Sequence, residues 1–153
     1  MIKKLAGTLL AAGTLLAFTA PAAYAAPPEP FTITETLDFH AETFTFTTTG
    51  GVLCPSGTFV DELQAVGGAE NQPKVNLQFR TVYTCDDDSG SFFAQKHVFL
   101  VFDEESGTST NTGPITLKGG TDAYVGLSGH GTNSGTADEF AGVGNISGEL
   151  KLS

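Results

Sequence analysis

Apolar and polar side chains alternate along most of this chain after residue 30. Phe31, Ile33, Leu37 and Phe39 share one parity, and a period of two indicates a strand with one buried face. Further strands are expected at Glu42–Thr49, Thr58–Val66, Val75–Cys85, Ser91–Phe102 and Thr108–Leu117. Short strands are also expected around Leu127, Phe140 and Ile146–Leu152. Because no stretch follows the helical period of 3.6, the pattern predicts an all-β protein.

Turn-forming residues separate these strands, for example Gly50-Gly51, Gly67-Gly68, Asp86–Gly90 and Asp103–Gly107. Regular strands joined by short turns are typical of a β-sandwich or a closed β-barrel. The pattern continues from residue 31 to residue 153 without a linker, and this length suits one domain. Residues 31–153 are therefore expected to form a single antiparallel domain.

The two most regular strands flank the acidic turn Asp86–Gly90. A five-residue turn centred on Asp88 would place Phe79 opposite His97 and Tyr83 opposite Phe93. One face of this hairpin then has no formal charge and is expected to be the interior; its polar members are Thr81, Tyr83, Gln95 and His97. These four are the candidate ligand-binding residues, because a few polar groups in an apolar cavity orient a ligand. The alternative for His97 is a hydrogen-bonded core histidine.

The other face of the hairpin combines charge with an apolar band. Arg80 and Lys96 are expected to lie in water, yet the same face carries Phe92, Val98, Leu100 and Phe102. A strand that is apolar on both faces is covered on both. We therefore expect this band to be buried by another part of the chain or in a homo-oligomer.

The first residues have the three parts of a secretory signal peptide. Lys3 and Lys4 precede an uncharged apolar stretch, residues 5–20, and Ala23-Tyr24-Ala25 fits the small-x-small cleavage rule. Cleavage after Ala25 would make residues 1–25 a signal peptide and the product a secreted protein. The alternative, a transmembrane anchor, is disfavoured because the apolar run is shorter than a span of ~20 residues. Residues 26–30 are expected to be a mobile, Pro-rich lead-in.

Charge narrows the classes of partner. The chain carries 17 acidic residues against 7 Lys and Arg, a net charge of −10. Removal of Lys3 and Lys4 with the signal would leave 5 basic residues against those 17. An acidic surface disfavours nucleic acid and anionic lipid, so neither is an expected partner of the mature chain. Because 40% of residues are hydrophobic and only 16% are charged, a disordered acidic tail is excluded.

Cys54 and Cys85 are the only cysteines. An even pair in an exported chain usually forms a disulfide, whose contribution to stability is roughly 3.5 kcal/mol in the chain-entropy model. The alternative is a metal-binding or catalytic thiol. Neither cysteine has a C-x-x-C partner or a neighbouring His, which favours the disulfide.

The segment Gly119–Thr132 reads Gly-Gly-Thr-Asp-Ala-Tyr-Val-Gly-Leu-Ser-Gly-His-Gly-Thr. It resembles the G-G-T-G-x-[YF]-x-G-x-x-G-x-G signature of allene oxide cyclase-like and dirigent-like β-barrels, including small exported bacterial proteins. Asp122 stands where this signature has Gly, and Asp tolerates a left-handed turn. The resemblance implies an antiparallel eight-stranded barrel, often oligomeric, with a mostly apolar cavity. No catalytic residue of the family matches a position here, so no activity is carried over.

Three functions remain open. The first is a secreted, non-enzymatic barrel that binds a small apolar ligand, or whose interior is simply filled by side chains. The second is an isomerase or cyclase of the allene oxide cyclase-like type, and the third is a structural or surface protein that acts through its outer apolar band. No His/Cys cluster has the spacing of metal ligands, so neither a metal nor a cofactor is expected.

Overall fold

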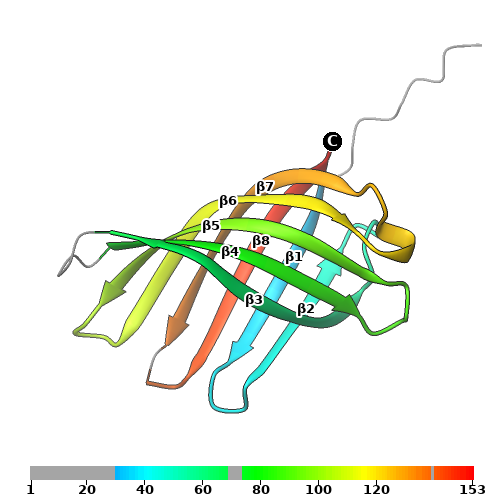
Figure 1. Ribbon diagram of the computed structural model, residues 1–153. Coiled ribbons are helices and arrows are strands. Elements are labelled where there is room, and N and C mark those ends of the chain that lie inside the picture. Colours follow the sequence, from blue (N-terminus) through cyan, green and yellow to red (C-terminus); the bar gives the residue numbers. More distant parts are fainter. Residues whose placement is uncertain (1–29, 69–73, 139) are drawn as a thin grey trace, which may run out of the picture.

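The chain forms one closed antiparallel β-barrel in a computed structural model, which describes residues 30–68, 74–138 and 140–153 (Figure 1). The strands are β1 (Pro30–Asp38), β2 (Thr43–Thr49), β3 (Ser56–Gly67), β4 (Lys74–Cys85), β5 (Ser91–Asp103), β6 (Thr108–Gly120), β7 (Ser128–Asp138) and β8 (Val143–Leu152). Each strand pairs with its sequence neighbours, and β1 closes the barrel against β8. The predicted single barrel of about eight strands is confirmed.

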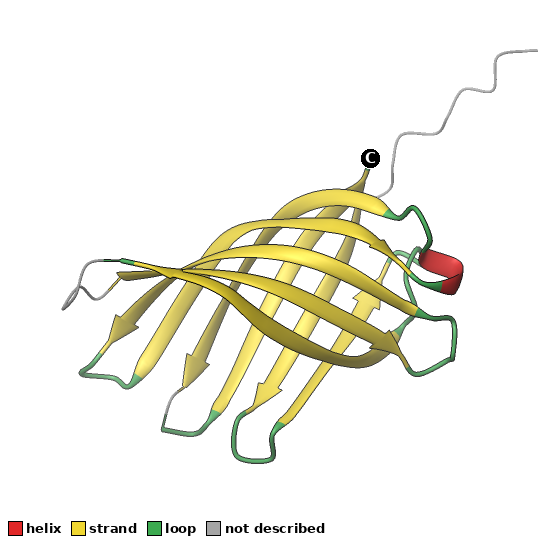
Figure 2. Cartoon of the chain, viewed as in Figure 1, coloured by secondary structure: helices red, strands yellow, loops and turns green. Residues whose placement is uncertain are grey.

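Helical structure is minimal. In the described ranges it consists of one 3-10 turn, η1 (Asp122–Tyr124), which lies in the loop between β6 and β7 at one end of the barrel (Figure 2). None of the helical structure described is long and apolar enough to cross a lipid bilayer.

Two sequence predictions change at the ends of the chain. The last part forms two long strands, β7 and β8, rather than the expected short ones, and Phe140 lies in the exposed turn between them. The alternation there is hard to see because glycines replace apolar residues on the inner face. The signal peptide and most of the lead-in lie outside the described residues. Pro30, predicted to belong to the lead-in, instead begins β1 and pairs with Lys151.

The loops gather at two ends of the barrel (Figure 1). The loops at residues 50–55, 86–90 and 121–127 share one end, which we call the core end. The loops at residues 39–42 and 104–107 lie at the other, which we call the cavity end. Cys54 and Cys85 form the predicted disulfide at the core end, with an S–S distance of 2.07 Å and Cα atoms 5.9 Å apart.

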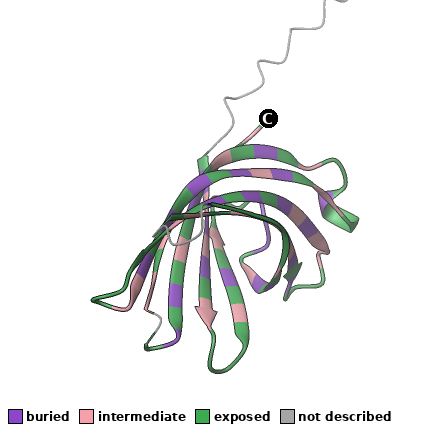
Figure 3. Cartoon of the chain, turned by 60° about the vertical axis from the view of Figure 1, so that its left-hand side comes forward, coloured by how far each residue is buried: buried purple, intermediate pink, exposed green. Residues whose placement is uncertain are grey.

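Aromatic side chains fill the core end. Tyr83 and Phe92 stack with ring centroids 4.6 Å apart, and Phe46 packs edge-on against both. Buried residues alternate with exposed ones along most of the strands (Figure 3), as expected where side chains point alternately into and out of a barrel. The other large apolar side chains that are fully buried in the described structure are Phe31, Ile33, Ile115, Leu117 and Leu150.

The glycine-rich segment 119–132 forms tight turns and allows two strands to approach closely. Asp122 has a φ of +49°, so this departure from the family signature occupies the left-handed region that Asp tolerates. Gly126 has a φ of +78° in the loop that follows η1. A Cβ at Gly131 would lie 1.9 Å from the carbonyl oxygen of Glu149, so β7 and β8 approach each other too closely there for any side chain.

The central hairpin has a register one residue away from the predicted one. Thr84 pairs with Ser91 and Tyr83 with Phe92, and the Cys85 N–H donates to the Gly90 carbonyl, leaving a four-residue turn, Asp86–Ser89. The positive φ of Asp88 (59°) helps this shorter turn to form. A shift of one residue exchanges the two faces of a strand. The predicted interior of β5 is therefore its outer face.

Candidate functional site

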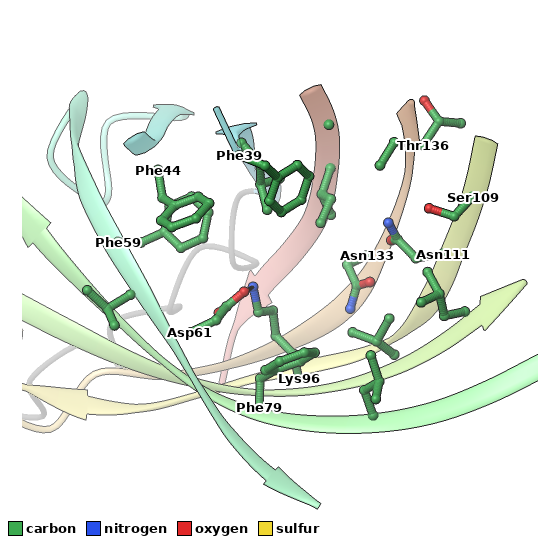
Figure 4. A pocket seen from close by; sticks show the side chains of 18 of the residues that line it. Phe39, Phe44, Phe59, Asp61, Phe79, Lys96, Ser109, Asn111, Asn133 and Thr136 are labelled. Carbon is green, nitrogen blue, oxygen red and sulfur yellow. Dashed lines mark hydrogen bonds and ion pairs between the residues drawn. The ribbon is translucent and has the colours of Figure 1, made fainter. Parts of the chain in front are cut away.

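The cavity end of the barrel encloses a cavity of about 720 Å³ (Figure 4), within the range of small-molecule sites. It reaches solvent, because the lining residues Phe39 and Glu42 are exposed. Most of its lining is apolar: Leu37, Phe39, Phe44, Phe59, Leu77, Phe79, Val98, Leu100, Ala137 and Ile146. Its polar lining is Glu42, Asp61, Lys96, Ser109, Asn111, Asn133 and Thr136.

One side of the cavity is aromatic. Phe44 lies between Phe39 and Phe59, with ring centroids 6.1 and 5.8 Å away. β3 runs on to Gly67 but pairs with β2 only through Ser56–Thr58. These rings therefore line the part of the cavity where β3 has separated from β2.

The opposite side, built from β6, β7 and β8, is made mostly of small residues, with Ile146 as an exception, and this explains the empty volume. The residues of β7 that share the parity of Asn133 are Gly129, Gly131, Gly135 and Ala137. Asn133 itself pairs with Gly113 on β6 and with Gly148 on β8. Side chains of this size cannot meet the rings across the barrel, so the interior stays unfilled.

A buried charge cluster lies at the boundary between core and cavity. The Lys96 Nζ is 3.0 Å from both carboxylate oxygens of Glu35 and 3.0 Å from Oδ1 of Asp61. The Thr81 hydroxyl donates to Asp61 and the Tyr83 hydroxyl donates to Glu35, each at 2.5 Å. Lys96 and Glu35 are almost fully buried, whereas the Asp61 side chain is 23% exposed and borders the cavity.

Tyr83 serves this cluster as a neutral donor. Burial raises the pKa of the Tyr83 hydroxyl well above 10, and the charges of Glu35 and Asp61 raise it further. The phenol therefore keeps its proton at physiological pH and directs it at Glu35. The two buried members of the cluster, Lys96 and Glu35, form an ion pair, and the second acid, Asp61, is partly exposed.

Two asparagines lie on the small-residue side of the cavity. Asn111 on β6 and Asn133 on β7 are 8% and 2% exposed. Within the described structure, Oδ1 of Asn111 and both Oδ1 and Nδ2 of Asn133 are buried without a hydrogen-bond partner. Buried polar atoms without partners are rare, because each costs about 1–3 kcal/mol. Both amides line the cavity, across from the phenylalanine rings (Figure 4).

The four predicted ligand-binding residues divide into two pairs. Thr81 and Tyr83 face the interior, where they bind the charge cluster. Gln95 and His97 are exposed on the outer wall, so the prediction that they share an inner face with Tyr83 is wrong. The physical reason is the one-residue shift of the hairpin.

The same shift removes the argument for self-association through an outer apolar band. Phe92 and Val98 are buried inside the barrel, and Leu100 lines the cavity. Phe102 has the same parity and is 38% exposed at the cavity end. These four residues therefore lie on the inner face of β5, and the prediction that they form an apolar band on the outer wall is wrong.

Glu35, Asp61, Lys96 and the two asparagines were missed by the sequence reasoning. The charge of Lys96 predicts a position in water, whereas a lysine that is buried as an ammonium is paired with carboxylates, and Glu35 shares the parity of Phe31 and Ile33. That parity was the available signal for a buried acid. For Asn133, the signal was the lack of any large side chain on its face of β7.

Among the described residues, one group of side chains is close enough together to ligate a metal ion: Cys54, Cys85 and Asp87. The two sulfurs form the disulfide, which leaves them without the thiolate needed to ligate a metal.

No protein-family model matches this chain, and neither does any curated protein or solved structure. The resemblance of Gly119–Thr132 to allene oxide cyclase-like and dirigent-like barrels therefore stays a prediction. The barrel fold does not depend on this resemblance, because the strand pairings show it directly.

Proposed function

We propose that this protein is a secreted β-barrel that binds a small, largely apolar ligand in its cavity. The observation that carries the proposal is the cavity of about 720 Å³, whose lining is mainly apolar with a few buried polar groups. This combination is the usual composition of a small-molecule site. The disulfide is compatible with an oxidising compartment, which supports export.

Binding is favoured over the alternative of an isomerase or cyclase by the state of the charged groups. A general acid or base needs a proton that can move at the operating pH. The ammonium of Lys96 is already bound by Glu35 and Asp61, and Tyr83 retains its proton. These groups are arranged to stabilise one another rather than to transfer protons to a ligand.

The proposal can be tested with the neutral apolar dye N-phenyl-1-naphthylamine, whose fluorescence increases in apolar surroundings. We expect saturable binding to the purified protein. In a Leu100→Trp variant, the larger side chain would occupy the cavity and weaken binding by about tenfold or more, which corresponds to 1.4 kcal/mol.

Val101→Trp is the matched control, because Val101 follows Leu100 on β5 and is exposed on the outer wall. This control should bind the dye like the parent protein. The chain has no tryptophan of its own, so each new indole reports its surroundings by its emission wavelength. Dye binding that is absent, or equal in both folded variants, would refute ligand binding in this cavity.

A further inference from the structure

We infer that the cavity selects amphiphiles with an uncharged head group that both donates and accepts hydrogen bonds, of which a carboxamide is the best match. The inference rests on the proposed function and assigns the chemistry of the ligand. Its basis is the placement of Asn111 and Asn133 in the cavity wall.

The unpartnered atoms of the two asparagine amides indicate which hydrogen-bonding groups the ligand must supply. Oδ1 of Asn111 and Oδ1 of Asn133 require donors, whereas Nδ2 of Asn133 requires an acceptor. A carboxylate offers only acceptors and an ammonium offers only donors. A carboxamide offers both. Since both ends of Asn133 lack partners, the requirement is the same whichever way that amide is turned.

The charges around the cavity also disfavour an acid. Lys96 is the one cationic residue in the described lining, and its ammonium is already bound by Glu35 and Asp61. Asp61 and Glu42 add negative charge to the lining. A fatty carboxylate would therefore find no available cation and would be repelled by at least one carboxylate.

The rest of the cavity accommodates an apolar body. Phe44 on β2 and Phe59 on β3 face the asparagines across the cavity (Figure 4). Leu77 and Leu100 also line it. Burial of an alkyl chain against these side chains is favourable, and each further CH₂ group that is buried adds to it. Apolar burial thus provides the affinity, and the amides provide the choice of head group.

The test compares four decyl compounds as competitors of N-phenyl-1-naphthylamine, each used below its micelle concentration: decanamide, 1-decanol, decanoate and decylamine. We expect decanamide to displace the dye at concentrations about tenfold lower than decanoate, because two or more buried polar atoms gain partners. Decanol should lie between them, because a hydroxyl makes fewer hydrogen bonds than an amide.

An Asn133→Leu variant should bind decanamide and decanoate with affinities that agree within about twofold. Asn76→Leu on the exposed outer face of β4 makes the same chemical change outside the cavity and should preserve the preference. Thermal unfolding without ligand supplies a second readout: removal of buried unpartnered atoms should leave Tm of Asn133→Leu unchanged or raise it. An Asn111→Leu variant repeats both measurements if Asn133→Leu does not fold.

Three outcomes would overturn the inference while leaving ligand binding intact. The first is equal binding of all four head groups by the parent protein, which would mean that water satisfies the amides. The second is tightest binding of decylamine, which would move head-group recognition to Asp61. The third is an amide preference that persists in Asn133→Leu. Failure of the proposed function would give a different result. The dye would then not bind to the protein, or its binding would be the same in Leu100→Trp as in the parent protein.

Discussion

A cluster of three charged side chains, Lys96, Glu35 and Asp61, lies inside the barrel next to the cavity. Transfer of three charged groups from water into a protein costs several kcal/mol for each ion, and their mutual attraction offsets this only when the remaining donors and acceptors are also matched. Thr81 and Tyr83 supply that matching by donating to Asp61 and Glu35. The cluster connects the aromatic core, through Tyr83, to the cavity wall, through Asp61 and Lys96.

The contribution of Tyr83 should depend on pH in a defined direction. An unfolded phenol loses its proton near pH 10, whereas burial and the charge of Glu35 raise the pKa of folded Tyr83 well above that value. Its stabilisation is therefore complete below pH 10 and declines as the pH rises further. We expect Tyr83→Phe to lower the free energy of unfolding by about 1–3 kcal/mol at pH 7, because Glu35 loses a buried donor.

Urea unfolding of both proteins at pH 7, 9 and 10.5 measures this dependence. The difference between parent and Tyr83→Phe should be constant up to pH 9 and smaller at pH 10.5. Thr81→Val removes a neighbouring donor without removing a group that titrates near pH 10, so its effect should not change over this range. A Tyr83→Phe difference that stays constant up to pH 10.5 would contradict the assigned role of burial.

Among the elements, the central hairpin shows what the sequence could and could not determine. Alternation along β4 and β5 located both strands to within about one residue at each end, because the period of two depends only on the sequence of each strand. The pairing of the strands depended on the length of one turn. Asp86–Gly90 is compatible with four or five turn residues, and that single residue decided whether His97 or Lys96 faces inward.

The cavity was harder to predict for a related reason. A strand whose inner face carries glycine and alanine, as β7 does around Asn133, has no hydrophobic period to detect. Long-range pairing with β6 and β8 determines which of its faces lies inside. The pairing that places the two asparagines in one wall is therefore a property of the closed barrel and not of any local stretch.

The close pairing of β7 and β8 at Gly131 predicts the effect of a single methyl group. In Gly131→Ala the new Cβ would lie 1.9 Å from the carbonyl oxygen of Glu149, so the backbones must separate. We expect a loss of about 1–3 kcal/mol in the free energy of unfolding, measured by urea titration. Gly67→Ala is the control, because its Cβ would have no atom nearer than 3.7 Å. Equal stability of the two variants would argue against close approach at Gly131.

On the scale of the whole molecule, the two ends of the barrel differ: one is filled with side chains and the other contains the cavity. The core end has the disulfide, the stacked aromatic residues and the buried Tyr124, whose hydroxyl accepts a hydrogen bond from the Cys54 backbone N–H at 2.9 Å. The cavity end has small residues on three strands and unpartnered amides. Most of the stabilising contacts are at the core end, where the interior is filled. The cavity end can therefore retain an unfilled space, although this space weakens the packing there.

This division predicts that stability and binding can be separated. Replacing both cysteines in a Cys54→Ser, Cys85→Ser double variant should lower the free energy of unfolding by about 2–5 kcal/mol, because the unfolded chain gains conformational freedom. The cavity is lined by residues of the opposite end, and neither cysteine contributes to it. The folded variant should therefore bind N-phenyl-1-naphthylamine with an affinity within about twofold of the parent, since no contact that contributes to binding has changed.

Urea titration measures the free energy of unfolding, and dye titration at a temperature well below the midpoint of unfolding measures the affinity. A variant that is folded but has lost dye binding would show that the two ends are coupled, and that the cavity depends on the packing of the core end.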